Sequence, residues 1–182
     1  MLQQDVRTNL WFNPGISPEN PIYDTIKPYT CSHMLWNGLV ADYTIPEARN
    51  IIQEHFKKNM TDIGVSGYKM DENDGYDFWL WPDLATFPSC IAAEQIRQIY
   101  GSLIQQTFSD IYRERNQRTY GLVRSANAGT SSFPFVLYND YYDHRDFVTA
   151  LINSSFIGVL WSPEARGTPA YTCDESGGWF CG

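Results

Sequence analysis

The stretch IGVSGYKM, residues 63–70, followed by DENDGYD, residues 71–77, decides the fold that this sequence predicts. It begins as a short apolar run and then places four carboxylates within seven residues. A parallel strand has an apolar interior, and α/β proteins place their chemistry at its carboxyl end. We therefore interpret residues 63–70 as a buried strand that delivers acidic side chains to a functional rim.

Helices and strands alternate around this strand. Apolar residues at three- and four-residue steps, or in short runs, predict helices over 44–59, 92–116 and 144–156 and strands over 63–70, 119–124, 135–140 and 157–162. Residues 11–30 are rich in proline and predict a loop with short extended pieces. This alternation is typical of a parallel sheet or barrel.

The residues around position 44 are typical of the beginning of a helix. Thr44 and Glu47 have the spacing of a capping box, and Pro46 falls in the first turn. In the second helix, the core face is expected to be the apolar set Ile96, Ile99, Tyr100, Leu103, Ile104, Phe108 and Ile111.

Composition narrows the range of partners. The 182 residues are 43% hydrophobic and 15% aromatic, which suits one packed domain. The net charge of −8 argues against nucleic acid, and no run of 18 apolar residues predicts a membrane span. An acidic chain with many aromatic side chains suits a neutral polar ligand such as a sugar.

The cysteines and histidines give no metal-ligand spacing, so we expect no cofactor and no metal. The four cysteines are interpreted as free or buried thiols. A disulfide between Cys173 and Cys181 is the alternative in an oxidising compartment.

Polar residues follow each predicted strand at its carboxyl end. They are Lys69 and Asp71, then Arg124, Ser125 and Asn127, then Asn139 and Asp140, and finally Trp161 and Glu164. Two carboxylates on one rim can cleave a glycosidic bond, since one attacks the anomeric carbon and the other protonates the departing oxygen. The attacking carboxylate must be ionised, and a nearby Lys69 or Arg124 would lower its pKa.

Two other readings of this acidic rim remain open. Asp71, Glu72 and Asp74 could hold Mg²⁺ or Ca²⁺ in a metal-dependent barrel enzyme, although the stretch lacks the twelve-residue calcium-loop pattern. The rim could also belong to a carbohydrate-binding remnant without catalytic activity.

Four blocks of the sequence, in order, resemble glycoside hydrolase family thirty-one, the family of α-glucosidases, α-xylosidases and α-galactosidases. They are WNGLVADYTIPEAR (36–49), KMDEND (69–74), RSANAG (124–129) and LYND (137–140). The resemblance extends from about Trp11 to Arg166 and implies a (β/α)8 TIM barrel, a glycosidase acting on α-linked sugars, and no cofactor.

The resemblance also implies roles for individual residues. Asp71 would be the catalytic nucleophile and Asp140 the general acid/base of a retaining mechanism. The sugar-binding subsite would be lined by Trp36, Lys69, Arg124 and Asn139.

The sequence departs from the family pattern in residues and in extent. Lys69 stands where many α-glucosidases have tryptophan, Glu72 replaces methionine and Leu137 replaces tryptophan, which favours a divergent branch. The chain corresponds to roughly strands three to seven, so we expect a single partial barrel over 1–182 with an irregular, unrelated tail at 167–182. Such a piece, expressed alone, is expected to be inactive or aggregated because it exposes sheet edges and apolar core.

Overall fold

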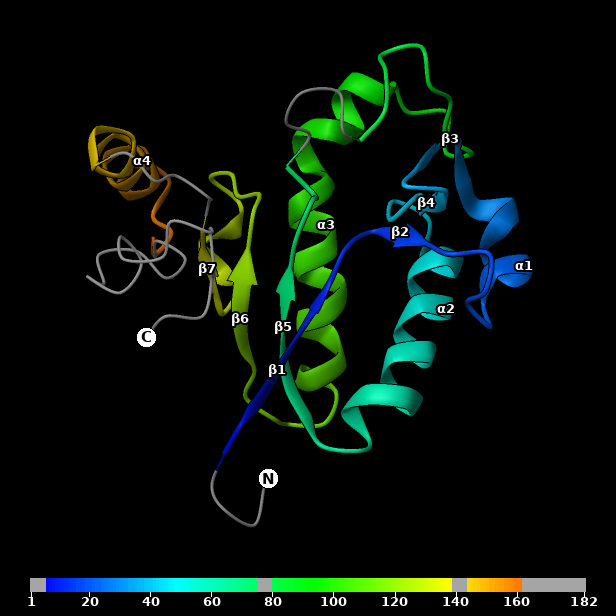
Figure 1. Ribbon diagram of the computed structural model, residues 1–182, viewed down its shortest axis with the longest axis horizontal. Helices are drawn as coiled ribbons and strands as arrows, with labels where there is room; N and C mark the ends of the chain where they lie inside the picture. Colours follow the sequence, from blue (N-terminus) through cyan, green and yellow to red (C-terminus); the bar gives the residue numbers. More distant parts are fainter. Residues whose placement is uncertain (1–5, 75–79, 139–143, 162–182) are drawn as a thin grey trace, which may run out of the picture.

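The computed structural model describes residues 6–74, 80–138 and 144–161 (Figure 1). Parallel strands are β1 (Thr8–Phe12), β5 (Val65–Met70), β6 (Tyr120–Val123) and β7 (Phe135–Leu137). Antiparallel strands are β2 (Gly15–Ile16), β3 (Thr30–Leu35) and β4 (Gly38–Ala41). The helices are α1 (Tyr23–Ile26), α2 (Pro46–Phe56), α3 (Ala93–Arg113) and α4 (His144–Ile157). Single turns of 3-10 helix span Lys27–Tyr29 and Thr130–Ser132, and a π-helical turn spans Lys57–Thr61.

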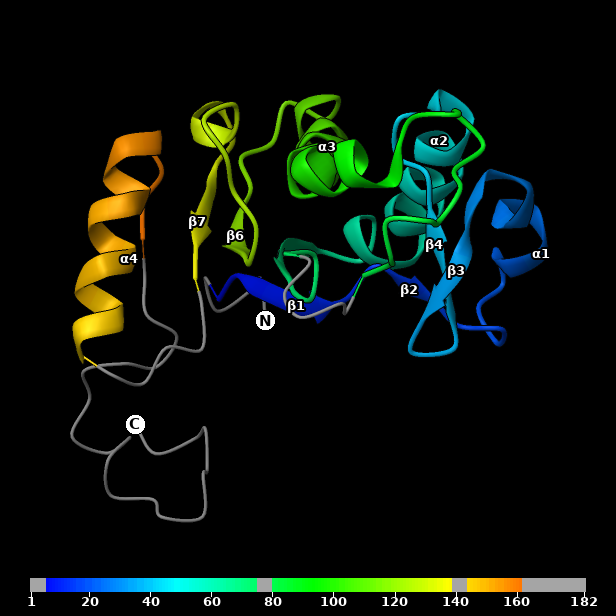
Figure 2. The same ribbon diagram turned by 90° about the horizontal axis from the view of Figure 1, so that it is seen from above.

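The parallel sheet has the strand order β1-β5-β6-β7 and confirms the predicted α/β architecture. Helices α2 and α3 lie on one face of this sheet, as Figures 1 and 2 show from two directions. The carboxyl ends of the four strands therefore share one rim, which is the arrangement that the polar strand ends predicted.

Strand β1 was missed by the sequence interpretation, which assigned residues 11–30 to a loop with short extended pieces. Residues 8–12 pair in parallel with β5 at the edge of the sheet, with Trp11 opposite Lys69 and Phe12 opposite Met70. Only three consecutive apolar residues precede Asn13 and Pro14, so the apolar pattern is too short to predict a strand. The strand forms because it pairs with β5, which lies more than fifty residues later in the sequence.

An aromatic cluster joins β1 to the helices. The ring of Phe12 lies 4.5 Å from that of Phe108 on α3, and the ring of Phe56 on α2 lies 4.7 Å from the same Phe108 ring. Tyr68 of β5 completes the cluster, with its ring 5.2 Å from Phe108. Aromatic packing of this kind, tilted or edge-to-face, adds to the burial of apolar surface, so it fixes the sheet against both helices.

Helix α3 buries most of its predicted stripe, including Ile96, Tyr100, Ile104 and Phe108. Ile99 differs from the prediction, because 40% of it is exposed to solvent.

The capping box predicted at α2 is wrong. Ile45 occupies the N-cap position without a side-chain cap, while Pro46 takes the first turn as expected. The hydroxyl of Thr44 instead donates to Asp42 Oδ1 at 2.5 Å, and the amide of Ser89 donates to Asp42 Oδ2 at 3.1 Å. Asp42 is fully buried, so its carboxylate needs these donors and draws Thr44 away from the helix end.

The strand predicted at 157–162 is reduced, in the described part of the chain, to one parallel bridge between Leu137 and Trp161. Helix α4 extends to Ile157, and Gly158 follows it with a φ of 72°. A glycine in this left-handed conformation is a common helix end, so the residues predicted to open the strand are used by the helix and its cap.

None of the helices in the described part of the chain is long and apolar enough to cross a membrane.

Candidate active site

Asp71 follows β5 directly and lies beside the end of β1. Trp11 Nε1 donates a hydrogen bond to Asp71 Oδ2 at 2.7 Å, and the backbone amide of Glu72 donates to Oδ1 at 2.8 Å. Only 13% of the Asp71 side chain is exposed. The carboxylate therefore has a fixed orientation, held from two neighbouring segments.

Two cations approach the same carboxylate. Arg124, which follows β6, has a terminal nitrogen 3.4 Å from Asp71 Oδ1 and its Nε 3.3 Å from Asp74 Oδ2. Lys69 Nζ lies 3.9 Å from Asp71 Oδ2 and 4.8 Å from the centre of the Tyr138 ring. The structure thus brings together three of the residues named from the sequence: Lys69, Asp71 and Arg124.

The pKa of Asp71 is lowered from its ordinary value, although burial by itself raises it. The hydrogen bond from Trp11 and the nearby Tyr138 side chain oppose burial most strongly, followed by the Glu72 amide and the charge of Arg124. The sequence analysis expected the lowered pKa but assigned it to the cations alone. Hydrogen bonds to the charged form are the larger cause, and they keep Asp71 ionised.

The pKa values of the neighbouring acids, Glu72 and Asp74, shift in the opposite direction. Burial, and then the charge of Asp71, raises the pKa of Glu72. Burial also raises the pKa of Asp74, with a smaller contribution from Asp71. Asp71 is therefore the carboxyl group of these three that ionises most readily, and the acids beside it ionise less readily.

Trp36 reaches this rim from the hairpin between β3 and β4. Trp36 and Asn37 form its turn with φ angles of 50° and 62°, and 61% of Trp36 is exposed. The Trp36 side chain lies close enough to the Glu72 carboxylate to oppose the rise of its pKa. The indole thus lies beside the acidic segment and still presents a face to solvent.

Three residues of the rim were missed from the sequence. Trp11 and Asn13 lay in the stretch assigned to a loop with short extended pieces, and Tyr138 directly precedes Asn139 in the LYND block. Asn13 lies close enough to the Glu72 side chain to oppose the rise of its pKa. Recognising residues 8–12 as a strand would have placed Trp11 at the same rim, because a strand delivers its last residues there.

Asn139 and Asp140 lie outside the described residues, as do Asp77, Glu164, Cys173 and Cys181. The roles assigned to Asn139 and Asp140 therefore remain predictions. Cys31 is buried and Cys90 exposed, and both are free thiols.

Within residues 6–74, 80–138 and 144–161, no group of three or more histidine, cysteine, aspartate or glutamate side chains could hold a metal ion. Asp71 and Asp74 face Arg124 instead.

Comparison with known proteins assigns the family. The family model for the TIM-barrel domain of glycosyl hydrolases family 31 matches residues 1–169. The chain belongs to this family. Its open parallel sheet is accordingly part of a TIM barrel, as the sequence predicted. No curated protein matches the chain.

Solved structures of family 31 share this fold. An α-xylosidase from a soil metagenome, in complex with xylose, is 21% identical with a TM-score of 0.78, covering 93% of this chain and 29% of that one. A cycloalternan-degrading enzyme from Trueperella pyogenes, in complex with a covalent intermediate, is 15% identical with a TM-score of 0.74, covering 90% and 25%. A sulfoquinovosidase from E. rectale is 17% identical with a TM-score of 0.65, covering 78% and 23%. The chain spans less than a third of the length of each.

Proposed function

We propose that this chain carries the nucleophile side of the active site of a retaining α-glycosidase. Asp71 attacks the anomeric carbon of an α-linked sugar and forms a glycosyl–Asp71 intermediate. Asp140 first protonates the departing oxygen and then activates the water that releases the sugar. The observation that carries this proposal is the Asp71 carboxylate, which is oriented by Trp11 and Arg124 and has a lowered pKa.

The sugar would lie against the exposed indole of Trp36, with Lys69, Arg124 and Asn139 contacting its hydroxyl groups. An aromatic face packs on the apolar side of a sugar ring, and charged donors next to the carboxylate select its hydroxyls. The covalent intermediate in the Trueperella pyogenes enzyme and the xylose in the α-xylosidase support this chemistry for a family 31 rim.

A second candidate function is carbohydrate binding without turnover. The observation that favours it is the sheet itself, which has four strands in the described part of the chain, whereas a TIM barrel closes with eight. Such a protein would hold a sugar on the Trp36 side of the rim but would not form a bond to Asp71.

An activated glycosyl fluoride inactivator distinguishes these functions. Fluoride leaves without help from a general acid, so the reagent tests the nucleophile even where the acid/base residue is out of place. We expect mass spectrometry to find one sugar adduct on Asp71, and none after Asp71→Asn. Sugar binding without an adduct would support the binding function, and an adduct elsewhere would contradict the assignment of Asp71.

A further inference from the structure

A second cavity lies at the opposite end of the parallel sheet from Asp71. It lies where three neighbouring strands begin. It is lined by Arg7 before β1, by residues 64–66 at the start of β5, and by residues 117–120 leading into β6. Its volume is about 620 Å³, within the range of small-molecule sites. Strand β5 rises about 3.3 Å per residue over six residues, so this cavity is distinct from the candidate active site.

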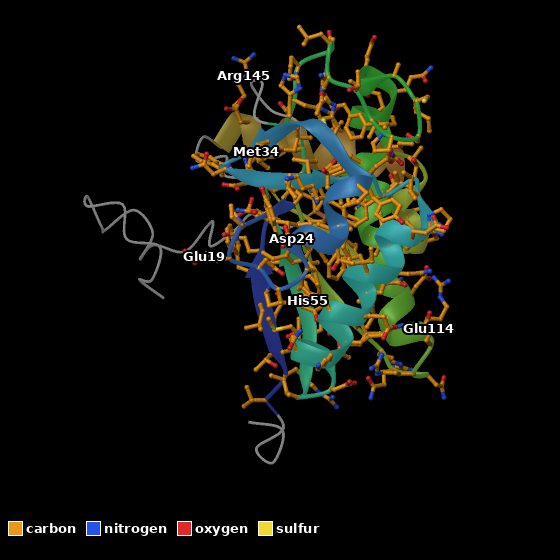
Figure 3. The ribbon with its side chains drawn as sticks, turned by 90° about the vertical axis from the view of Figure 1, so that its right-hand side faces the viewer. Glu19, Asp24, Met34, His55, Glu114 and Arg145 are labelled. Atoms are coloured by element: carbon orange, nitrogen blue, oxygen red, sulfur yellow. The ribbon has the colours of Figure 1, made fainter. Side chains whose placement is uncertain are left out.

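Charge is the unusual feature of this cavity. Arg7 and Arg118 both line it, and neither forms an ion pair with any residue that the structure describes. The acids nearby already have partners, since Asp62 pairs with Arg115, and Glu114, near the end of α3 in Figure 3, pairs with Lys57 at 2.6 Å. The chain has 21 acidic and 13 basic residues, yet two guanidinium groups at one cavity have no ion-pair partner among the described residues.

The uncharged lining adds both polar and apolar groups. Gln117 contributes an amide, and the Tyr120 hydroxyl makes only a long contact of 3.5 Å to the Arg7 carbonyl oxygen. Val65 and the half-exposed Tyr120 ring provide apolar surface. A bare inorganic anion would fill only a small part of this volume, so a larger molecule with an anionic end fits better.

We propose that this cavity binds a small phosphomonoester, with its phosphate held by Arg7 and Arg118. Guanidinium groups present paired N–H donors that match phosphate oxygens, and two of them balance the phosphate dianion. The organic part of the ligand lies against Tyr120 and Val65. This site is independent of the proposed glycosidase function, because it shares no residue with the Asp71 rim.

Isothermal titration calorimetry on the 182-residue chain tests the proposal, with phenyl phosphate, inorganic phosphate and benzoate as probes. We expect phenyl phosphate to bind most tightly and inorganic phosphate more weakly. Arg7→Ala and Arg118→Ala should each weaken phenyl phosphate binding at least tenfold. Lys27→Ala removes another exposed cation without an ion-pair partner among the described residues, outside the cavity, and should leave binding unchanged.

Circular dichroism of each variant checks that the fold is retained. The proposal is overturned if phenyl phosphate does not bind the wild-type chain, if benzoate binds as tightly, or if both arginine variants bind phenyl phosphate as the wild-type chain does.

Discussion

At the scale of single residues, the chemistry proposed here depends on how Asp71 is kept charged in a crowded acidic segment. Burial favours its protonated form, whereas Trp11, Tyr138, the Glu72 amide and Arg124 favour the carboxylate. The lowered pKa is the balance of these effects. A nucleophile in this environment stays ionised to a lower pH than an ordinary aspartate does.

Replacing Trp11 by Phe tests the contribution of its hydrogen bond. Asp71 reacts only when ionised, so its reaction rate with the glycosyl fluoride falls as the pH drops through its pKa. Without the Trp11 donor the pKa rises, and the fall begins at a higher pH. At pH values below the pKa of Asp71, we expect the rate to drop about tenfold. Hydrogen bonds to charged groups contribute about 1.5–3 kcal/mol, and the lower end applies because Trp11 is half-exposed.

Trp36→Phe is the matched control for that experiment. Its indole affects the pKa of Glu72 and is not among the groups that shift the pKa of Asp71, so the pH at which the rate begins to fall should not change. An unchanged pH profile for Trp11→Phe would show that the indole does not set the charge of Asp71.

At the scale of elements, the site depends on the close pairing of β5 and β6, because these strands carry Asp71 and Arg124. A Cβ atom on Gly67 would lie 1.9 Å from the Tyr120 carbonyl oxygen, and one on Gly121 would lie 1.9 Å from that of Tyr68. Only glycine fits at either position without moving a strand.

Gly67→Ala should therefore lower the free energy of unfolding by about 3 kcal/mol or more, because the clash is with backbone and cannot be relieved by a side-chain rotation. Urea denaturation followed by circular dichroism measures this change. Gly129→Ala is the control, since its Cβ would meet only the Asn127 side chain at 3.2 Å, and its cost should stay within about 1 kcal/mol. Equal stability of the two variants would contradict the tight strand pairing.

Elements also show what the sequence could and could not predict. The long periodic pattern of α3 and the apolar run of β5 were sufficient by themselves, so both were predicted. Strand β1 was missed because its stability comes from β5 and the aromatic cluster, and Trp11 was missed with it. The prediction of a Thr44 cap was wrong because the Thr44 hydroxyl donates to Asp42 instead. Asp42 needs this donor only once folding buries it against Ser89, which the local sequence does not reveal.

At the scale of the whole molecule, the sheet is open and its carboxyl ends form one continuous rim. Helices α2 and α3 cover one face (Figure 2). Trp11 and Trp36 are both more than half-exposed. Lys69, Asp71 and Arg124 were predictable because strand ends in a parallel sheet must share an edge. The placement of Asn139 and Asp140 relative to them remains a prediction of the same rule.

The measurement that tests this account most directly is the distance between the carboxyl groups of Asp71 and Asp140 in a crystal structure. A retaining glycosidase requires about 5–5.5 Å between them, and we expect that separation across a bound sugar. Well-ordered side chains separated by more than about 9 Å, or directed into different spaces, would contradict the proposed pairing of nucleophile and acid/base.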